Sequence, residues 1–250
     1  MRVTNAVREA EAAEQWRALH SALIGLGVDV QLVEPAPHVP DMVFTANAGI
    51  AAGGQFVPAN FRYVERQPEA PLFTRWFAER GYDVQSIDGS QHWEGEGDVL
   101  ASDGRVFAAS GTRTEPRALD RIDAILGLET IRLELIDPRF YHLDTCFFPL
   151  SSECAAYYPP AFNSASRARL VEWFSDLIEV PTQDALRFAC NSVLVGQTVV
   201  MNTGADRTVR ALEERGYRCV ATPTSEFVKA VGSVKCLVLT LDTFRGPSAG

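Results

Sequence analysis

Polar side chains that could carry out chemistry interrupt several apolar segments of this chain. They are Asp41 and Asn47 in PDMVFTANAG, Glu94, Glu96 and Asp98 in WEGEGDVL, His142 and Asp144 in FYHLDTCFFPL, and Cys236 in GSVKCLVLTL. A thiol is a ready nucleophile near neutral pH, and an imidazole can pair with its thiolate and later donate a proton. Clustered carboxylates are costly to bury without a cation, which a protein arginine, a metal ion or the substrate would supply. A guanidinium, with five donors in a planar fork, fits such a cluster geometrically.

Most of these residues also have a simpler structural interpretation. His142 could be a hydrogen-bonded core histidine, and residues 94–98 could form a solvated acidic turn. Gly95 and Gly97 do not make a phosphate-binding loop, because their neighbours are acidic and no lysine follows. A metal site built from His142, Asp144 and a glutamate lacks a compact ligand spacing such as HExxH, so we expect no metal.

The cysteines do not form a recognisable framework. There are five, an odd number without CxxC spacing: Cys146, Cys154, Cys190, Cys219 and Cys236. Neither a set of disulfides nor a zinc ribbon fits, so we expect free thiols. Only Cys236 follows Gly232, Ser233 and Lys235, which suit a close backbone approach and a local positive charge. We therefore expect Cys236 to be the nucleophile and His142, with Asp144 beside it, to be the acid/base.

A helix, a glycine and a strand recur along the chain and would position these side chains. Residues 7–26 have the spacing of an amphipathic helix, Gly27 ends it, and residues 28–34 alternate at strand period. The same order recurs at 71–87, 118–135, 164–180 and 208–221, with apolar strand pairs between these units and a last strand pair expected at 228–241. This predicts about five strand–strand–helix–strand modules, with a period of about 45 residues, in one domain over residues 1–250. If the modules stack around an axis, equivalent strand ends converge and the polar side chains meet in a central pocket.

Composition excludes several classes of function. The formal net charge is −9, from 23 Lys plus Arg against 32 Asp plus Glu, and no Lys/Arg-rich stretch is present, so we expect no nucleic-acid partner. No apolar run approaches the roughly 18 residues that a membrane span needs. Residues 1–16 also lack the apolar core of a signal peptide, so we expect no membrane association and a cytoplasmic location.

Five segments together resemble the guanidine-modifying amidinohydrolases and amidinotransferases of the pentein fold. That superfamily includes arginine deiminases, dimethylarginine dimethylaminohydrolases and arginine dihydrolases. The segments are PDMVFTANAG, WEGEGDVL, GTRTEPRA, FYHLDTCFFPL and GSVKCLVLTL, and the resemblance extends over residues 25–241. It implies an α/β propeller of five modules with pseudo-fivefold symmetry, in agreement with the repeat. Family members usually begin with another strand, so we expect the first module to be incomplete.

The resemblance also implies catalytic roles. Cys236 would attack the guanidinium carbon, and His142 would protonate the departing amine and then deprotonate a water. Glu94 would hold the guanidinium, with Glu96 as a rival, because EGEGD has one residue more than the usual family spacing. The substrate-binding candidates are Asp41, Asn47, Glu96, Asp98, Arg113, Asp144 and Arg62. Arg113 in TRTEP matches an arginine that binds a substrate α-carboxylate, and Arg62 is a second candidate for that role.

Asn47 is a difference from the dimethylargininases and deiminases that this segment resembles, because those enzymes have an aspartate at the matching position. An asparagine removes one negative charge and adds an N–H donor that a neutral urea group could use. The FTANAG form resembles arginine dihydrolases, which hydrolyse the guanidinium twice and release ornithine. Both outcomes therefore stay open: one hydrolysis to a citrulline, or two to ornithine.

We expect a cofactor-free hydrolase whose partner is a small guanidino molecule. An amidinotransferase is the alternative within the enzyme class, although nothing marks a second amine-acceptor site. A pentein used as a non-enzymatic binding module is the alternative outside it, and such a protein would not need the Cys–His–Glu set. A homo-oligomer is compatible with the sequence.

Overall fold

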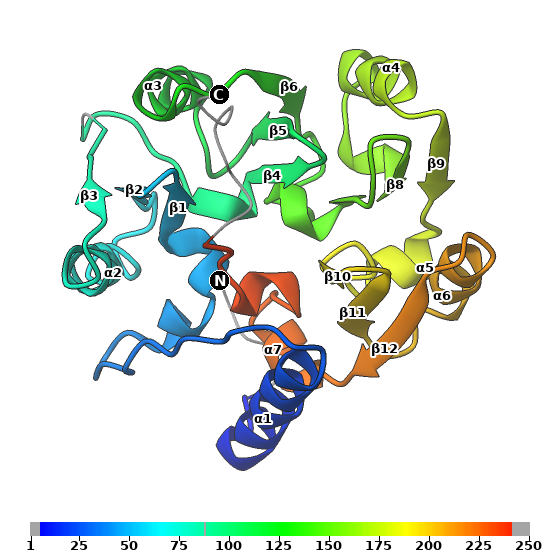
Figure 1. The fold of residues 1–250 in the computed structure, drawn as a ribbon, viewed down its shortest axis with the longest axis horizontal. Helices are drawn as coiled ribbons and strands as arrows, with labels where there is room; N and C mark the ends of the chain where they lie inside the picture. Colours follow the sequence, from blue (N-terminus) through cyan, green and yellow to red (C-terminus); the bar gives the residue numbers. More distant parts are fainter. Residues whose placement is uncertain (1–5, 88, 242–250) are drawn as a thin grey trace.

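The computed structural model describes residues 6–87 and 89–241, and it has an α/β fold in which four separate sheets surround a common centre (Figure 1). Their twelve strands are β1 (Gly49–Ala52), β2 (Gln55–Pro58), β3 (Asp83–Val84), β4 (Val99–Ser102), β5 (Arg105–Ser110), β6 (Thr130–Glu134), β7 (Phe147–Pro149), β8 (Cys154–Tyr157), β9 (Asp176–Glu179), β10 (Val193–Val195), β11 (Thr198–Asn202) and β12 (Arg218–Thr222). The helices of the described residues are α1 (Glu9–Gly25), α2 (Glu69–Ala78), α3 (Pro116–Leu126), α4 (Ser164–Trp173), α5 (Thr182–Ala185), α6 (Asp206–Glu213) and α7 (Ser225–Lys229).

The four sheets repeat one topology. Each begins with an antiparallel hairpin whose second strand is the middle strand, and a third strand then pairs parallel to it. A helix connects the second strand to the third: α2, α3, α4 and α6 in turn. This is the strand–strand–helix–strand module expected from the sequence, and four copies of it are confirmed. In Figure 1 the helices lie outermost and the hairpins face the centre.

Local sequence explains where two of these helices begin and end. Pro116 occupies the first turn of α3, where a missing N–H costs nothing, and Gly127 ends that helix with a left-handed φ of 63°. Asn163 caps α4 because its side chain accepts a hydrogen bond from the Ser166 amide at 2.8 Å. Gly127 therefore directs the chain from α3 into β6, and Asn163 fixes the start of α4, which precedes β9.

Two expected strand regions are not strands. Residues 28–34 form no regular element, although Val28 and Val30 pack against the core beneath α1. Residues 228–241 contain the end of α7 and a 3-10 turn, η6 (Lys235–Leu237), instead of a strand pair. Alternating apolar residues place side chains on a core, but a strand also needs a backbone partner. Among the described residues neither segment has one, so the sector holding α1 and α7 contains no sheet.

Short 3-10 turns stand directly before the first strand of three modules. They are η2 (Thr45–Ala48) before β1, η3 (Gly95–Gly97) before β4 and η4 (Leu143–Thr145) before β7. The turn η2 contacts η3 and η6, and η3 contacts η4. Gly95 permits this approach: its φ is 61°, and a Cβ there would lie 2.6 Å from the Ala46 and Gly49 carbonyl oxygens. The turns therefore bring the chemically interesting residues together at the centre.

Candidate active site

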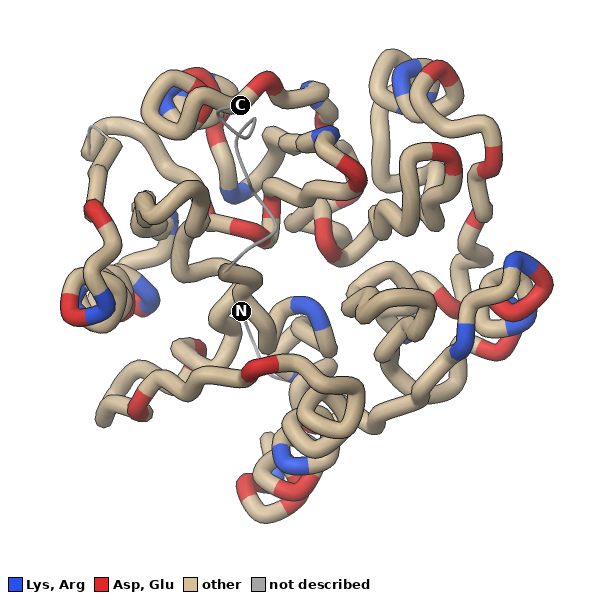
Figure 2. The backbone as a smooth tube through the Cα atoms, in the orientation of Figure 1, with Lys and Arg blue, Asp and Glu red and all other residues tan. Residues whose placement is uncertain are grey.

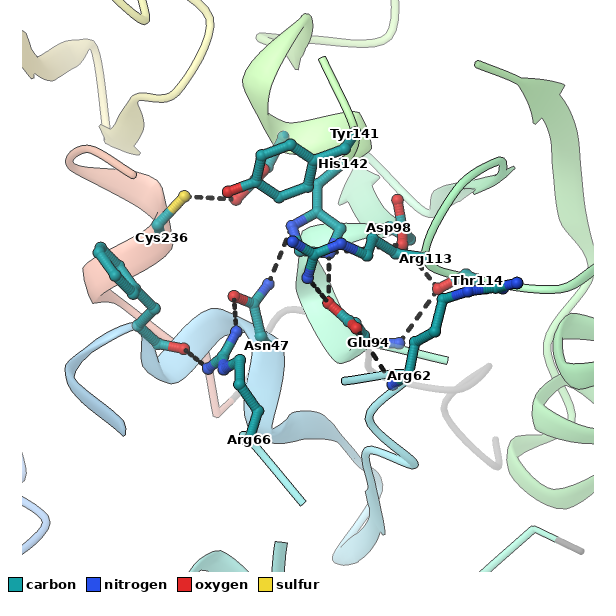
Figure 3. Close-up of polar contacts among 12 residues, drawn as sticks. Asn47, Arg62, Arg66, Glu94, Asp98, Arg113, Thr114, Tyr141, His142 and Cys236 are labelled. Carbon is teal, nitrogen blue, oxygen red and sulfur yellow. Dashed lines mark hydrogen bonds and ion pairs between the residues drawn. The ribbon is translucent and has the colours of Figure 1, made fainter. Parts of the chain in front are cut away.

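The candidate residues line the meeting point of these turns (Figure 3). His142, Glu94 and Asn47 are buried side by side, and Cys236 faces them from η6. Figure 2 shows acidic positions on the central segments as well as on the outer helices. The side chains of Glu94, Glu96, Asp98 and Asp144 are buried, so each of these carboxylates needs a donor or a cation.

His142 and Glu94 form the closest pair of the site. The His142 ring is 1% exposed, and its Nε2 lies 2.8 Å from Glu94 Oε2. Arg113 donates to the same Glu94 oxygen at 2.7 Å. Burial favours the neutral acid, but the hydrogen bond to His142 and the cations around Glu94 outweigh it and lower the pKa of Glu94 to about 2. Glu94 is therefore a carboxylate at neutral pH, positioned to orient His142.

Arg113 is packed between aromatic rings. Its guanidinium carbon lies 4.6 Å from the centre of the Tyr63 ring and 4.3 Å from that of Tyr141. Such stacking suits a planar guanidinium, which keeps its edge free for carboxylates. The Tyr141 hydroxyl in turn donates to the Val231 carbonyl oxygen at 2.8 Å. The arginine expected to bind a substrate carboxylate therefore lies in the site, paired with Glu94.

Asn47 is held by two neighbours. Arg66 Nη1 donates to Asn47 Oδ1 at 2.8 Å, and Asn47 Nδ2 lies 3.4 Å from His142 Nδ1. Arg66 also makes a two-bond contact with the buried Glu69, at 2.9 Å and 2.7 Å. Gly97 leaves room for this arrangement, since a Cβ there would overlap Asn47 Nδ2. Sequence reasoning missed Arg66, because nothing in RYVERQPEA distinguishes a buried arginine from an exposed one.

A second asparagine, Asn191, forms hydrogen bonds with Cys236. Asn191 Nδ2 lies 3.1 Å from Cys236 Sγ, and Asn191 Oδ1 accepts from the Cys236 amide at 3.2 Å. The thiol also lies 3.4 Å from Asp144 Oδ2. Burial, together with the Asp144 carboxylate, raises the pKa of the Cys236 thiol well above its ordinary value. Without a cation beside it, the sulfur is therefore a neutral thiol at neutral pH.

Asn191 occupies the position in its module that the other candidates occupy in theirs. It stands in CNSVLV directly before β10, as Asn47 stands before β1 and Asp144 before β7. The sequence contained this signal, a polar residue opening a strand pair, but Asn191 was not selected. Its side chain also donates to the Asp144 carbonyl oxygen at 3.2 Å.

Glu96 and Glu94 have different partners. Glu96 Oε2 accepts from Lys235 Nζ at 2.6 Å and from the Thr240 amide at 3.0 Å. Burial raises the pKa of Glu96 in spite of this ion pair. Lys235 also donates to the Val238 carbonyl oxygen at 2.9 Å, so it is bound on two sides. The pair ties η3 to η6, whereas Glu94 faces the imidazole.

Asp98 supports the His142 backbone. Its Oδ1 accepts from the Leu143 amide at 3.1 Å, and its Oδ2 accepts from the Thr114 hydroxyl at 2.6 Å. Asp98 Oδ2 also lies 3.9 Å from His142 Nε2. Burial raises the pKa of Asp98 to about 6. Asp98 therefore braces the turn that carries His142 and lies behind it.

Two candidates lie at the edge of this cluster. Asp41 is half-buried, and its backbone carbonyl oxygen accepts from Arg66 Nη2 at 3.1 Å. The Arg62 side chain is 42% exposed and lies 3.7 Å from Glu115, while its amide donates to Glu94 Oε1 at 3.4 Å. Both residues therefore border the site without entering its centre.

The described residues contain no group of three or more His, Cys, Asp or Glu side chains arranged to hold a metal ion. None of their helices is both long enough and apolar enough to cross a membrane. A thiol opposite an imidazole–carboxylate pair is suited to nucleophilic attack on an electrophilic carbon.

The sequence matches the family described as N,N dimethylarginine dimethylhydrolase, eukaryotic, over residues 2–243. The chain belongs to this dimethylarginine dimethylhydrolase family. It is 41% identical over 241 residues to the N(G),N(G)-dimethylarginine dimethylaminohydrolase of Mycobacterium tuberculosis, covering 96% of this chain and 79% of that protein.

A second type of relative is bifunctional. The chain is 43% identical over 233 residues to the arginine dihydrolase/ornithine cyclodeaminase ArgZ of Synechocystis sp., covering 91% of this chain and 33% of ArgZ. It therefore spans about a third of that relative. The crystal structure of the N-terminal domain of an ArgZ variant, covalently bound to a reaction intermediate, superposes with a TM-score of 0.92 at 40% identity, over 96% of this chain and 89% of that domain. This dimethylarginine dimethylhydrolase family member thus has the fold of an arginine dihydrolase domain.

Proposed function

We propose that this protein hydrolyses the guanidinium group of free arginine or a methylated arginine, with Cys236 as nucleophile and His142 as acid/base. The observation that carries this proposal is the arrangement of Cys236, held by Asn191, opposite a His142–Glu94 pair in one buried cluster. The match to the dimethylarginine dimethylhydrolase family and the likeness to ArgZ support the same chemistry.

The charge of the site supports a cationic substrate. Asp144 Oδ1 is buried and has no hydrogen-bond partner among the described residues, and the same holds for Glu96 Oε1. A guanidinium supplies several N–H donors in one plane, so it would satisfy such an oxygen and offset the cost of burying the carboxylates. Asp144 would receive the substrate guanidinium beside the Cys236 sulfur.

Substrate binding would also activate the nucleophile. Because burial and Asp144 raise the pKa of the thiol, a cation placed next to Cys236 lowers that pKa by favouring the thiolate. His142 takes the thiol proton on its unprotonated ring nitrogen. The sulfur then attacks the guanidinium carbon, forming an S–C bond and a tetrahedral adduct.

The adduct collapses when His142 returns the proton to the departing amine. The C–N bond breaks, ammonia or a methylated amine leaves, and a thiouronium remains on Cys236. His142 next deprotonates a water that adds to the same carbon. Breaking the S–C bond releases the ureido product and regenerates the thiol with a proton from His142.

Asn47 favours arginine and a second hydrolysis. A neutral amide at this buried position leaves the site able to hold an uncharged urea as well as a guanidinium. In the second round the sulfur attacks the urea carbon, another ammonia leaves, and water releases a carbamate that decomposes to carbon dioxide and ornithine. One hydrolysis to a citrulline is the second candidate, and the 41% identity to the dimethylaminohydrolase favours it.

Product analysis tests the proposal. Purified protein is incubated with arginine and, separately, with dimethylarginine, and ornithine, citrulline, ammonia and dimethylamine are quantified by mass spectrometry. Ornithine with two equivalents of ammonia per arginine supports double hydrolysis. Citrulline alone, with dimethylamine from the methylated substrate, supports the single hydrolysis. No product from either substrate would refute the proposed function.

We also propose that the modules are arranged as a propeller. Four modules are observed, and the sector with α1, α7 and η6 would be a fifth, incomplete module of a pseudo-fivefold propeller. The support for it is that Asn47, Asn191 and Cys236 come from three different turns that meet at one centre.

A further inference from the structure

We propose that Arg66 is a positioning residue: by holding the Asn47 amide in one orientation, it keeps His142 in the tautomer whose proton is on Nε2. The groups involved form a buried hydrogen-bond chain, Glu69–Arg66–Asn47–His142–Glu94. Figure 3 shows this chain from Arg66 to Glu94. Only the consequence of this chain for catalysis rests on the proposed function.

The first link is the fixed position of Arg66. Its guanidinium makes two bonds to Glu69, a third to the Asp41 carbonyl oxygen, and lies 4.5 Å from the centre of the Phe61 ring. The side chain is 7% exposed, and the carboxylate that anchors it is fully buried. Such a guanidinium cannot rotate without breaking charge-assisted hydrogen bonds.

The second link is the orientation of the Asn47 amide. A guanidinium has donors only, so the Asn47 atom that lies 2.8 Å from Arg66 Nη1 has to be its oxygen. The amide nitrogen then faces the other way, towards His142 Nδ1 at 3.4 Å. Without Arg66 nothing among these contacts would distinguish the two ends of the amide.

The third link is the imidazole. An amide nitrogen can only donate, so His142 Nδ1 has to accept and carries no proton. Glu94 presents a carboxylate oxygen to Nε2 at 2.8 Å, and because a carboxylate can only accept, Nε2 carries the proton of this hydrogen bond. The two contacts together specify a neutral ring protonated on Nε2.

The orientation of the Asn47 amide favours a neutral ring, whereas the surrounding carboxylates favour a charged one. The carboxyl groups near the ring are Glu94, Asp98 at 3.9 Å and Asp144 in the same turn, and all of them favour an imidazolium when ionised. The cations Arg113 and Arg66 contact Glu94 and Asn47, the two hydrogen-bond partners of the ring. Tyr141 packs its ring edge-on against the imidazole, and Cys236 faces the site from η6. An N–H pointing at Nδ1 is the group that disfavours a second proton there.

The consequence concerns the base. In the proposed reaction, the unprotonated Nδ1 is the nitrogen that takes the proton of Cys236 and of the attacking water. A ring protonated on Nδ1 would present a donor instead and would lack a base at the start of each step.

Nitrogen NMR of the imidazole rings tests the inference without measuring turnover. The chain has four histidines, and the His142 signals are assigned with a His142→Gln variant. In the unaltered protein near pH 7.5 we expect the Nδ1 resonance in the unprotonated range and the Nε2 resonance in the protonated range. In the Asn47→Asp variant one carboxylate oxygen still accepts from Arg66, while the other oxygen replaces the amide N–H that faces Nδ1. Because that oxygen can only accept a hydrogen bond, both ring nitrogens should become protonated.

Removal of the guanidinium is the decisive variant. Arg66→Met combined with Glu69→Gln avoids an unpaired buried carboxylate, and it frees the amide of Asn47 to turn its oxygen towards Nδ1. That oxygen would accept a hydrogen bond from Nδ1, so the Nδ1 resonance should move into the protonated range. Arg80→Met, which removes an exposed arginine stacked on Trp76, is the matched control and should change nothing.

Two results would overturn the inference: a proton on Nδ1 in the unaltered protein, or an unchanged His142 spectrum in a folded Arg66→Met/Glu69→Gln variant. If that double variant does not fold, the Asn47→Asp spectrum decides, and an unprotonated Nδ1 in it contradicts the inference. A protein that shows the expected tautomer but no hydrolysis would refute the proposed function and leave the positioning role intact.

Discussion

Arg113 donates to Glu94 Oε2 at 2.7 Å, and that same oxygen lies 2.8 Å from His142 Nε2. One carboxylate oxygen therefore serves both the protein's own guanidinium and the imidazole. The sequence assigned Glu94 to the guanidinium of a substrate and Arg113 to a substrate carboxylate. In the structure the two residues satisfy each other, so a bound substrate has to draw Arg113 away from Glu94 or use the free oxygen of Asp144.

Replacement of Arg113 should weaken substrate binding. Arg113→Met removes the cation beside Glu94 and a donor for a substrate carboxylate, and a hydrogen bond to a charged group contributes about 1.5–3 kcal/mol, or roughly a 10- to 100-fold loss of kcat/KM. We expect most of this loss in KM, measured by steady-state kinetics. Arg113→Lys, which keeps the charge but not the planar fork, should recover part of it. An unchanged KM in Arg113→Met would contradict a binding role.

Replacing Glu94 and Glu96 with glutamine in two separate variants should distinguish a residue that serves catalysis from one that serves stability. Glu94→Gln removes the carboxylate that orients His142, so kcat should fall by about 100-fold or more while the protein stays folded. Glu96→Gln leaves Lys235 buried without its counter-charge, and it should lower the free energy of unfolding by about 3 kcal/mol. Urea denaturation and initial rates measure the two effects. The opposite pattern would make Glu96 the residue that serves the chemistry.

The reactivity of Cys236 should depend on a nearby cation. Because its pKa is raised, alkylation of Cys236 near pH 7 should be slow in the free protein and faster when a non-hydrolysable guanidinium is bound. Asn191→Asp adds a negative charge 3.1 Å from the sulfur and should suppress both alkylation and turnover. Cys219, half-buried and with a pKa raised to about 11, is the internal control in the same mass-spectrometric assay. Equal acceleration at both cysteines would argue against a cation site at Cys236.

Asp98 should make stability depend on pH. Its pKa is about 6 in the folded protein against an ordinary 3.8, so the folded state holds a proton that the unfolded state has lost. The stability gained from that proton is complete below pH 3.8 and is lost as the pH rises through 6. Asp98→Asn lacks this loss. Its free energy of unfolding, relative to the unaltered protein, should therefore rise by about 1.4 kcal/mol from pH 5 to pH 8. Chemical denaturation at several pH values measures it, and a constant difference would refute the shift.

Local sequence alone determined the repeating order of elements and the candidates that open each strand pair. Glycine and proline stops, strand-period alternation and amphipathic helices act within a few residues of one another. Four of the about five modules expected from the chain are therefore observed, and Asn47, Glu94 and His142 precede strand pairs as expected. The same local signals failed at residues 28–34, because a strand exists only with a hydrogen-bonding neighbour, and that neighbour is a property of the fold.

Only the tertiary structure decided which polar groups pair. Glu94 and Glu96 are two residues apart and chemically alike, yet one faces His142 and the other Lys235, 139 residues away. Arg66 and Asn191 could be recognised only in the structure for the same reason. Each is important because of its hydrogen bond to a residue of another turn, Asn47 for Arg66 and Cys236 for Asn191. The energy of a buried hydrogen bond or ion pair depends on its partner's position and on the exclusion of water, and both are set by packing rather than by the order of residues.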